Sequence, residues 1–244
     1  MAAIPRRASA VRSPARRSRA AGPDPARPDR RQAILLAAEK LFAQHGYHAV
    51  TIRQIADEAA VPLALVGYYF GPKHELFHAI FAHWSHSIEA RLAGLRAVRN
   101  DPADPRTLPR IIEAFVAPVL ALRASPEGEY YALLVARELY HASAEADRVL
   151  RAFFAPLATA YIDALQIALP HATRGQVAWG YQFALGALTH HLSDVRVERL
   201  SRHENRRCDP AAAPLLVSFI VGGLRAALPR PKLPPKRPTA RRQT

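Results

Sequence analysis

Two short apolar stripes within residues 51–70 constrain the fold of this chain more than any other feature. Thr51 and Gln54 fit a capping box, in which each side chain satisfies a free backbone amide of the other, so a short helix is predicted to begin here. The stripe along this helix consists of Ile52, Ile55, Ala56 and Ala59. After a break at residues 60–62, a second short helix is predicted over residues 63–70, with Pro62 tolerated at its first turn.

A third amphipathic helix is predicted just before these two, over residues 31–45, because Gly46 stands where a helix commonly ends. Its apolar face consists of Ile34, Ala38, Leu41 and Phe42. Two short helices joined by a tight turn and supported by a preceding helix form a helix-turn-helix unit. The last helix of such a unit fits the major groove of DNA, which is about 12 Å wide.

Residues 31–81 resemble the TetR family of transcriptional regulators in about fifty consecutive positions. The landmarks are LFAQHGY, TIRQIADEA, the Tyr-x-Phe end of the third helix, and Lys73, Leu76 and Phe77. The subgroup whose third helix reads LAxVxYHFGxKExL is closer still. The resemblance implies a dimeric repressor that binds a palindromic operator and is released by a small hydrophobic molecule.

Three positions depart from the family pattern. Ala60 stands where the turn usually has glycine, so a left-handed backbone there would store strain on the order of 1 kcal/mol. Pro62 replaces the usual Ser or Thr cap, and Gly67 loosens the third helix by about 1 kcal/mol relative to alanine. We therefore expect this helix to be ordered mainly by its packing on the first two helices and by DNA itself.

The third helix offers few side chains that can hydrogen-bond a base. Leu63 and Ala64 suit contact with thymine methyl groups, and Gly67 permits a close approach of the backbone. Tyr68 and Tyr69 can donate to phosphates or to a base edge. The resemblance places phosphate contacts at Thr51 and Arg53, and an anion site is expected at Lys73 with the start of the fourth helix.

The net charge of +14 is concentrated at the two ends. Residues 1–31 carry nine arginines against two aspartates, and residues 229–244 carry six basic residues and no acid, which leaves the body near +1. The stretch 32–76 sums to −1, so the helix-turn-helix unit lacks an electrostatic attraction of its own for DNA. Residues 1–27 and 229–244 are expected to be disordered basic segments. The first is either a phosphate-neutralising arm or only a solubilising tail.

The rest of the chain shows helical patterns and no strand alternation, which predicts an all-α fold of about nine helices. A DNA-binding domain is expected over 28–88 and a ligand-binding and dimerisation domain over 89–228. Pro118 and Pro156 should kink or break the helices that contain them. The helices after residue 70 are predicted at 73–99, 109–124, 129–142, 145–169, 174–193 and 211–228.

The C-terminal half resembles the same subgroup at residues 133–143 and 178–194, some members of which respond to fatty-acyl or other hydrophobic ligands. A homodimer is expected through the last two long helices, whose small residues permit close helix packing. These small residues are Ala184, Gly186, Ala187, Gly222, Gly223 and Ala226. Aromatic walls and a rare polar group are typical of a hydrophobic pocket, or of an ordinary core. The candidate ligand contacts are Phe115, Tyr131, Arg137, Tyr140, Phe154, Tyr161, Trp179, Phe183 and His190.

Several classes of function are disfavoured. The single Cys208 and the absence of an apolar signal segment favour the cytoplasm, and the apolar run 215–224 is too short to span a membrane. Of the four histidines between residues 74 and 86, only His74 and His78 share a helix face, so no metal site or cofactor is expected. No catalytic motif is visible, which argues against an enzyme. A nucleoid or scaffold protein that binds DNA non-specifically through its tails remains the alternative.

Overall fold

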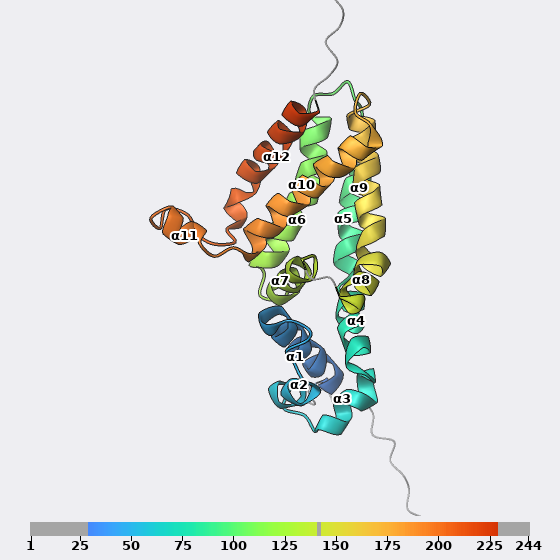
Figure 1. Cartoon of the computed structure of the whole chain (residues 1–244), viewed down its shortest axis with the longest axis vertical. Helices are drawn as coiled ribbons and strands as arrows, with labels where there is room; N and C mark the ends of the chain where they lie inside the picture. The colour runs from blue at the N-terminus through green and yellow to red at the C-terminus, as the bar shows by residue number, and fades with distance from the viewer. Residues whose placement is uncertain (1–28, 141–142, 229–244) are drawn as a thin grey trace, which may run out of the picture.

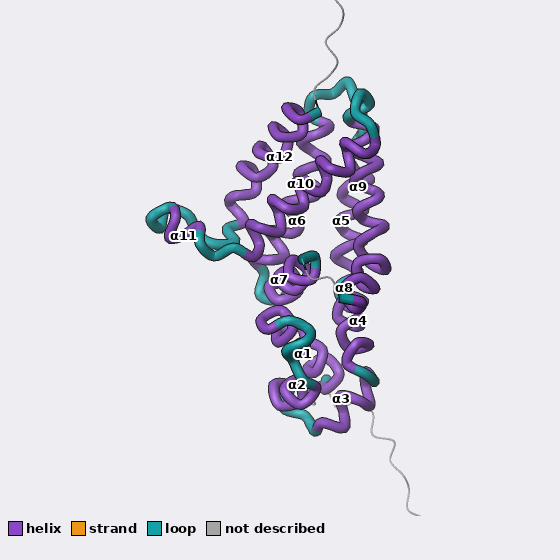
Figure 2. Tube along the Cα trace, viewed as in Figure 1, coloured by secondary structure: helices purple, strands orange, loops and turns teal. Residues whose placement is uncertain are grey.

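The computed structural model describes residues 29–140 and 143–228, all of whose regular elements are helical (Figure 2). The predicted basic segments 1–27 and 229–244 lie outside these residues. The α-helices are α1 (Arg30–His45), α2 (Ile52–Glu58), α3 (Leu63–Phe70), α4 (Lys73–His83), α5 (Ser85–Ala97), α6 (Thr107–Ala124), α7 (Glu129–Glu138), α8 (Ala144–Val149), α9 (Ala155–Ala168), α10 (Arg174–Ser193), α11 (Val197–Leu200) and α12 (Ala213–Ala227). The all-α prediction is confirmed.

Helices α1 to α4 form a compact unit at one end of the molecule, with α3 at its tip (Figure 1). Phe42 in the last turn of α1 contacts Tyr47 and Phe77, each with ring centroids 5.6 Å apart. Val66 and Phe70 are the buried residues of α3, and Val61 and Leu65 pack against the same core. The prediction that α3 is held by packing on the preceding helices agrees with this arrangement.

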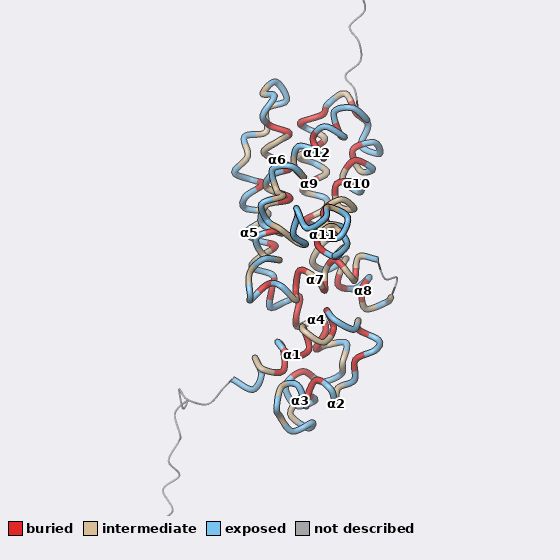
Figure 3. Tube along the Cα trace, turned by 90° about the vertical axis from the view of Figure 1, so that its left-hand side faces the viewer, coloured by how far each residue is buried: buried red, intermediate tan, exposed pale blue. Residues whose placement is uncertain are grey.

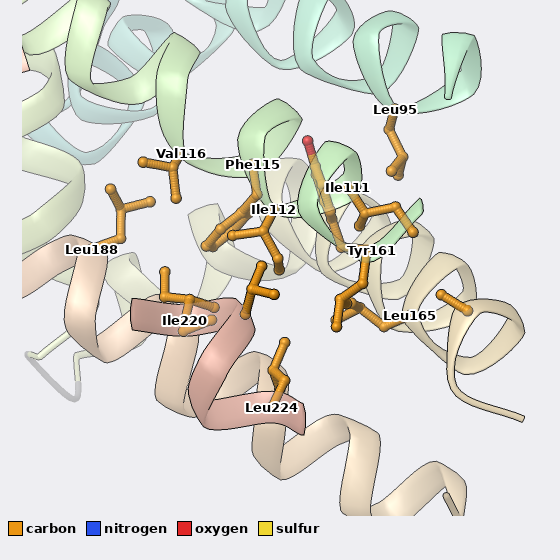
Figure 4. Packing of buried hydrophobic residues seen from close by; sticks show 14 of the residues in the cluster. Leu95, Ile111, Ile112, Phe115, Val116, Tyr161, Leu165, Leu188, Ile220 and Leu224 are labelled. Atoms are coloured by element: carbon orange, nitrogen blue, oxygen red, sulfur yellow. The ribbon is translucent and has the colours of Figure 1, made fainter. Parts of the chain in front are cut away.

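Helices α5, α6, α9, α10 and α12 build the larger bundle, and α7 lies across it next to α1 (Figure 1). Its core is centred on Phe115 and Tyr161, whose rings meet edge to face at 5.2 Å (Figure 4). The Tyr161 hydroxyl donates to the backbone carbonyl of Ala114 at 2.8 Å, so this buried polar group is satisfied.

Twelve α-helices appear among the described residues where about nine were predicted, because two expected helices are divided and one was missed. The helix predicted over 73–99 is interrupted at Trp84, whose backbone (φ −89°, ψ 6°) departs from helical values. The Trp84 indole donates to the buried Glu39 carboxylate at 2.7 Å and stacks on Tyr131, with ring centroids 5.0 Å apart. These long-range contacts stabilise the interruption of the helix. The local hydrophobic periodicity of the sequence does not reveal them.

The helix predicted over 145–169 is divided into α8, a π-helical turn (Leu150–Phe154) and α9. The wider turn absorbs the missing amide of Pro156, which then lies in the first turn of α9. Helix α6 by contrast continues through Pro118, so of the kink or break predicted there the break does not occur. Helix α7 ends at Glu138, earlier than predicted.

Helix α11 belongs to an excursion between α10 and α12 that projects from the bundle and is largely exposed (Figures 1 and 3). Arg202, His203 and Cys208 all take positive φ in the segment that follows α11, so the chain is not helical at these positions. The Cys208 thiol donates to the Leu192 carbonyl at 3.3 Å.

Candidate functional site

The outer face of α2 and α3 presents the predicted DNA contacts to solvent. Tyr68 is 79% exposed, Leu63 46% and Tyr69 37%, although all three are large apolar or aromatic residues. Thr51, Arg53, Ala64 and Gly67 are also exposed. A Cβ atom added at Gly67 would meet nothing within 4 Å, so the backbone of α3 is open to a close-fitting surface at this point.

Helix α2 is capped at its N-terminus, whereas the turn that follows it towards α3 is strained. Both bonds of the capping box at Thr51 and Gln54 form, with the Thr51 amide donating to the Gln54 side-chain oxygen at 2.8 Å. Ala60 has φ +52°, the left-handed conformation in which the family uses glycine. Pro62 begins α3 without a side-chain cap. The strain predicted at Ala60 is therefore present and is maintained by the burial of α3.

Lys73 is half-buried rather than free at the start of α4. Its ammonium group lies 4.4 Å from the centroid of the Tyr47 ring, a cation–π distance, and burial lowers its pKa. Lys40 is also engaged, in an exposed ion pair with Glu58 at 2.6 Å. Of the three cations between residues 32 and 76, only Arg53 is left exposed without an ion pair, which matches the weak attraction predicted for this face.

A partly open cavity of about 310 Å³ lies in the larger bundle between α5, α6, α7, α9 and α10. Its walls are mostly leucine, alanine and valine, and Tyr131 from α7 and Phe154 from the π-helical turn contribute aromatic surface. Arg91 from α5 and Tyr181 from α10 also line it. The volume and apolar lining are typical of a small-molecule site.

Two family models match this chain. Residues 34–80 match the model described as "Bacterial regulatory proteins, tetR family", and residues 113–223 match that of the "Tetracyclin repressor-like, C-terminal domain". The two matches fall on the helix-turn-helix unit and on the bundle that contains the cavity. The chain belongs to the TetR family of transcriptional regulators.

Individual relatives of this TetR-family chain match mainly its N-terminal part. The transcriptional regulator HbdR of Aromatoleum sp. is 48% identical over 48 residues, which are 20% of this chain and 21% of HbdR. The transcriptional activator FasR of Mycolicibacterium smegmatis is 32% identical over 90 residues, 36% of this chain and 40% of FasR. The chain thus spans less than half the length of these relatives.

Solved structures share the fold over nearly their whole length. The fatty acid degradation regulator FadR from Bacillus halodurans has a TM-score of 0.57 at 17% identity, with 82% of this chain and 98% of FadR covered. FadR from Bacillus subtilis in complex with stearoyl-CoA has a TM-score of 0.52 at 16% identity, with 79% and 98% covered. At this identity the likeness shows a common fold alone.

The structure separates the nine candidate ligand contacts of this TetR-family chain. Tyr131 and Phe154 line the cavity, whereas Phe115 and Tyr161 lie in the packed core beside it. Tyr140 is exposed and shares a 2.7 Å hydrogen bond with Thr189, a cavity residue, and His190 is exposed beside Asp194. Sequence analysis missed Arg91 and Tyr181, because their helices carry no signal that distinguishes a cavity wall from a core.

Arg137 faces the DNA-binding unit instead of the cavity. Its guanidinium donates to the carbonyls of Ala43 and Gln44 at 3.4 and 3.2 Å, at the C-terminus of α1. A cation is favourable at this negative end of a helix. A Cβ at Gly46 would lie 3.1 Å from Arg137 Nε, so glycine makes room for this contact. Arg137 therefore joins α7 to α1.

Trp179 and Phe183 lie on the outer surface, 64% and 66% exposed, and stack on each other at 5.8 Å. Phe219 of α12, which is 70% exposed, lines the same shallow groove between α10 and α12. Gly222 and Gly223 are exposed there with open space at their Cβ positions. The stretch Pro210–Ala227 is apolar and long enough to cross a membrane by composition, and little of it is buried within the chain.

Proposed function

We propose that the chain is a ligand-responsive repressor that binds a palindromic operator as a dimer and leaves it when a small hydrophobic molecule fills the cavity. The observation that carries this proposal is that two cavity-lining aromatics also contact the DNA-binding unit. Phe154 packs edge to face on Phe81 of α4 at 6.2 Å, and Tyr131 contacts Phe81 at 5.8 Å.

A second route joins the cavity to α1. Tyr131 stacks on Trp84 at an interplanar angle of 11°, and the Trp84 indole donates to Glu39 at the centre of α1. A ligand that displaces Tyr131 therefore displaces the residue at which α4 and α5 meet. Because cores change between discrete packings and deform little within one, this displacement tilts α4 and with it α3.

Release from DNA requires the ligand to favour one arrangement of the two α3 helices over the other. A ligand that bound both arrangements equally would not change operator affinity, however tightly it bound. For a coupling of typical size, about 1–3 kcal/mol, saturating ligand lowers operator affinity roughly 5- to 150-fold.

The groove between α10 and α12 is the proposed dimer interface. Its exposed aromatic residues and open glycines supply apolar surface and room for a second copy of the same two helices. A two-fold dimer places two α3 helices on successive turns of one DNA face, about 34 Å apart, which suits a palindrome. Such a protein acts in the cytoplasm.

The predicted DNA contacts Thr51, Arg53, Leu63, Ala64, Gly67, Tyr68, Tyr69 and Lys73 are proposed to position α3 in the major groove. Their exposure supports this role for all except Lys73, whose ammonium already lies on Tyr47. The arginine-rich residues 1–27, outside the described part of the chain, are proposed to supply the phosphate neutralisation that this face lacks.

The proposed class of ligand is inferred from the apolar wall of the cavity. The walls suit a fatty-acyl or aromatic molecule, and a structural relative, FadR from Bacillus subtilis, is known in complex with stearoyl-CoA. Relatives of comparable similarity are named both as an activator, FasR, and as a repressor, NicS of Pseudomonas putida, which is 36% identical over 86 residues.

The test is a binding titration with the DNA upstream of the protein's own gene, in competition with random duplex. A regulator prefers its own site about a thousandfold or more. Deleting residues 1–27 should flatten the dependence of affinity on salt. Equal affinity for both duplexes would support the alternative, a non-specific DNA-binding protein acting through its tails.

A further inference from the structure

Arg91 brings an uncompensated positive charge into the wall of the cavity. Its Nε atom is buried and has no hydrogen-bond partner, and its guanidinium lies 5.7 Å from the centroid of the Phe115 ring. Arg91 forms none of the ion pairs found within residues 29–140 and 143–228. Burial lowers the pKa of Arg91, and guanidinium nevertheless stays charged in proteins.

The surroundings of Arg91 are phenolic instead of acidic. The titratable groups that interact electrostatically with Arg91 are the hydroxyls of Tyr131, Tyr161 and Tyr181. No Asp or Glu is among the described residues that line the cavity. Tyr161 already donates to Ala114, whereas the Tyr131 hydroxyl is buried beside the Ser87 side chain. A cationic group with an unsatisfied Nε and a buried phenol hydroxyl therefore lie in the same cavity wall.

The second cation at the cavity already has an acidic partner. Arg151 lines the cavity near the π-helical turn, but its side chain is mostly exposed and pairs with Asp147. The site therefore offers a single net charge in an otherwise apolar chamber. A largely buried guanidinium that has no acidic partner is unfavourable, so we expect a ligand to supply an anion.

We propose that the cavity binds a carboxylic acid whose carboxylate pairs with Arg91 and accepts from the Tyr131 hydroxyl, while its hydrocarbon part fills the apolar chamber. This inference rests on the proposed function and names the ligand class of the same site. The planar guanidinium matches the two oxygens of a carboxylate. A phosphate dianion would require a second free cation.

The cavity also limits the size of the acid. At about 30 Å³ for each methylene- or water-sized group, 310 Å³ has room for roughly ten such groups. A saturated acid of medium chain length, such as decanoic acid, fits this volume. An acyl-CoA does not satisfy the site, because its thioester offers no carboxylate to Arg91.

The test compares decanoate, decan-1-ol and decanoyl-CoA by calorimetric titration of the full-length protein. Decanoate is expected to bind about 10- to 100-fold more tightly than decan-1-ol, which corresponds to a charge-assisted hydrogen bond to the carboxylate. Arg91→Met should remove this preference and leave decan-1-ol binding unchanged. Arg96→Met, at an exposed arginine of the same helix, is the matched control and should leave both affinities unchanged.

A second variant tests the proposal in case Arg91→Met does not fold. Tyr131→Phe keeps the ring on Trp84 and removes only the hydroxyl, so it should weaken decanoate several-fold and spare decan-1-ol. Arg91→Met should also raise the melting temperature of the ligand-free protein, because it removes a largely buried charge that has no acidic partner. A ligand preference that survives in Arg91→Met would overturn the proposal. Failure of decanoate to bind, or equal or tighter binding of decan-1-ol or decanoyl-CoA, would do the same.

Operator release measured on the same samples separates this inference from the proposed function. If decan-1-ol binds as well as decanoate and releases the operator, the regulator is ligand-responsive and the carboxylate inference is wrong. If decanoate binds through Arg91 and the operator stays bound, the carboxylate inference holds and the proposed ligand response is wrong.

Discussion

Glu39 places a carboxyl group in the interior where α1 meets Trp84 and α7. The residue is only 2% exposed, and burial raises its pKa from the ordinary 4.5 to about 7, against the opposing effect of hydrogen bonds from the Trp84 indole and the Tyr131 backbone. The contact between the two parts of the regulator therefore contains a group that titrates near neutral pH.

This titration predicts a pH-dependent stability. Because the folded pKa is raised, the stabilisation is complete below about pH 4.5 and is lost as the pH rises through about 7. At 1.36 kcal/mol per pKa unit, the loss is on the order of 3 kcal/mol. Urea unfolding between pH 5 and 8 should show it, and Glu39→Gln should flatten the curve. Parallel curves for the two proteins would show that Glu39 is ionised at all these pH values.

A substitution at Gly67 should change the stability of the protein and its affinity for DNA in opposite directions. Gly67→Ala should stabilise the folded protein by up to about 1 kcal/mol, because the new methyl group enters open space and alanine favours a helix. The same methyl group should weaken operator binding if the backbone of α3 approaches the bases. Thermal unfolding and DNA titration of one sample test both effects. Unchanged operator affinity would place Gly67 away from the groove.

At the scale of elements, α10 and α12 approach closely at Gly180. A Cβ there would lie 2.5 Å from Leu224 Cδ2, and Leu224 is itself buried. Gly180→Ala should therefore destabilise the protein by about 1–3 kcal/mol through overpacking, despite its gain in helix propensity. Gly186→Ala in the same helix, where a Cβ meets nothing within 4 Å, is the matched control and should not destabilise. Equal unfolding midpoints would refute this account of the packing.

The elements that were predicted correctly are those determined by residues close together in the sequence. The capping box at Thr51, the stripes of α1 and α2 and the strain at Ala60 follow from residues within a few positions of one another. The break at Trp84 depends on Glu39 and Tyr131, which are 45 and 47 positions away in the sequence. Local periodicity carries no information on such contacts, so the helix over 73–99 was predicted as continuous.

The two candidate sites also differ in how far the local sequence could predict them. The exposed face of α3 was predictable because its residues are consecutive and α3 must bury Val66 and Phe70, which turns Leu63 and Tyr68 outwards. The cavity is assembled from five separate α-helices and the π-helical turn, and an aromatic residue such as Phe115 has the same local pattern whether it packs in the core or lines a cavity. Arg91 was missed because an isolated arginine on a helix usually faces solvent.

At the scale of the whole molecule, the groove between α10 and α12 predicts the oligomeric state. Trp179→Asp combined with Phe219→Asp should convert the proposed dimer to a monomer, because two charges would be buried without partners in the interface. The monomer should lose most operator affinity, since one α3 reads only half of a palindrome. Leu200→Asp, on the exposed α11, is the control. Light scattering that still shows a dimer for the double variant would place the interface elsewhere.

The central claim is that filling the cavity drives the regulator off its DNA. Ala158 lines the cavity, and Ala158→Phe should fill it without any ligand, whereas Ala152→Phe places the same ring on the exposed surface nearby. The decisive measurement is operator affinity by fluorescence anisotropy for the parent and these two variants. The account predicts at least a fivefold loss for Ala158→Phe and none for Ala152→Phe. Unchanged affinity in a folded Ala158→Phe protein would contradict it.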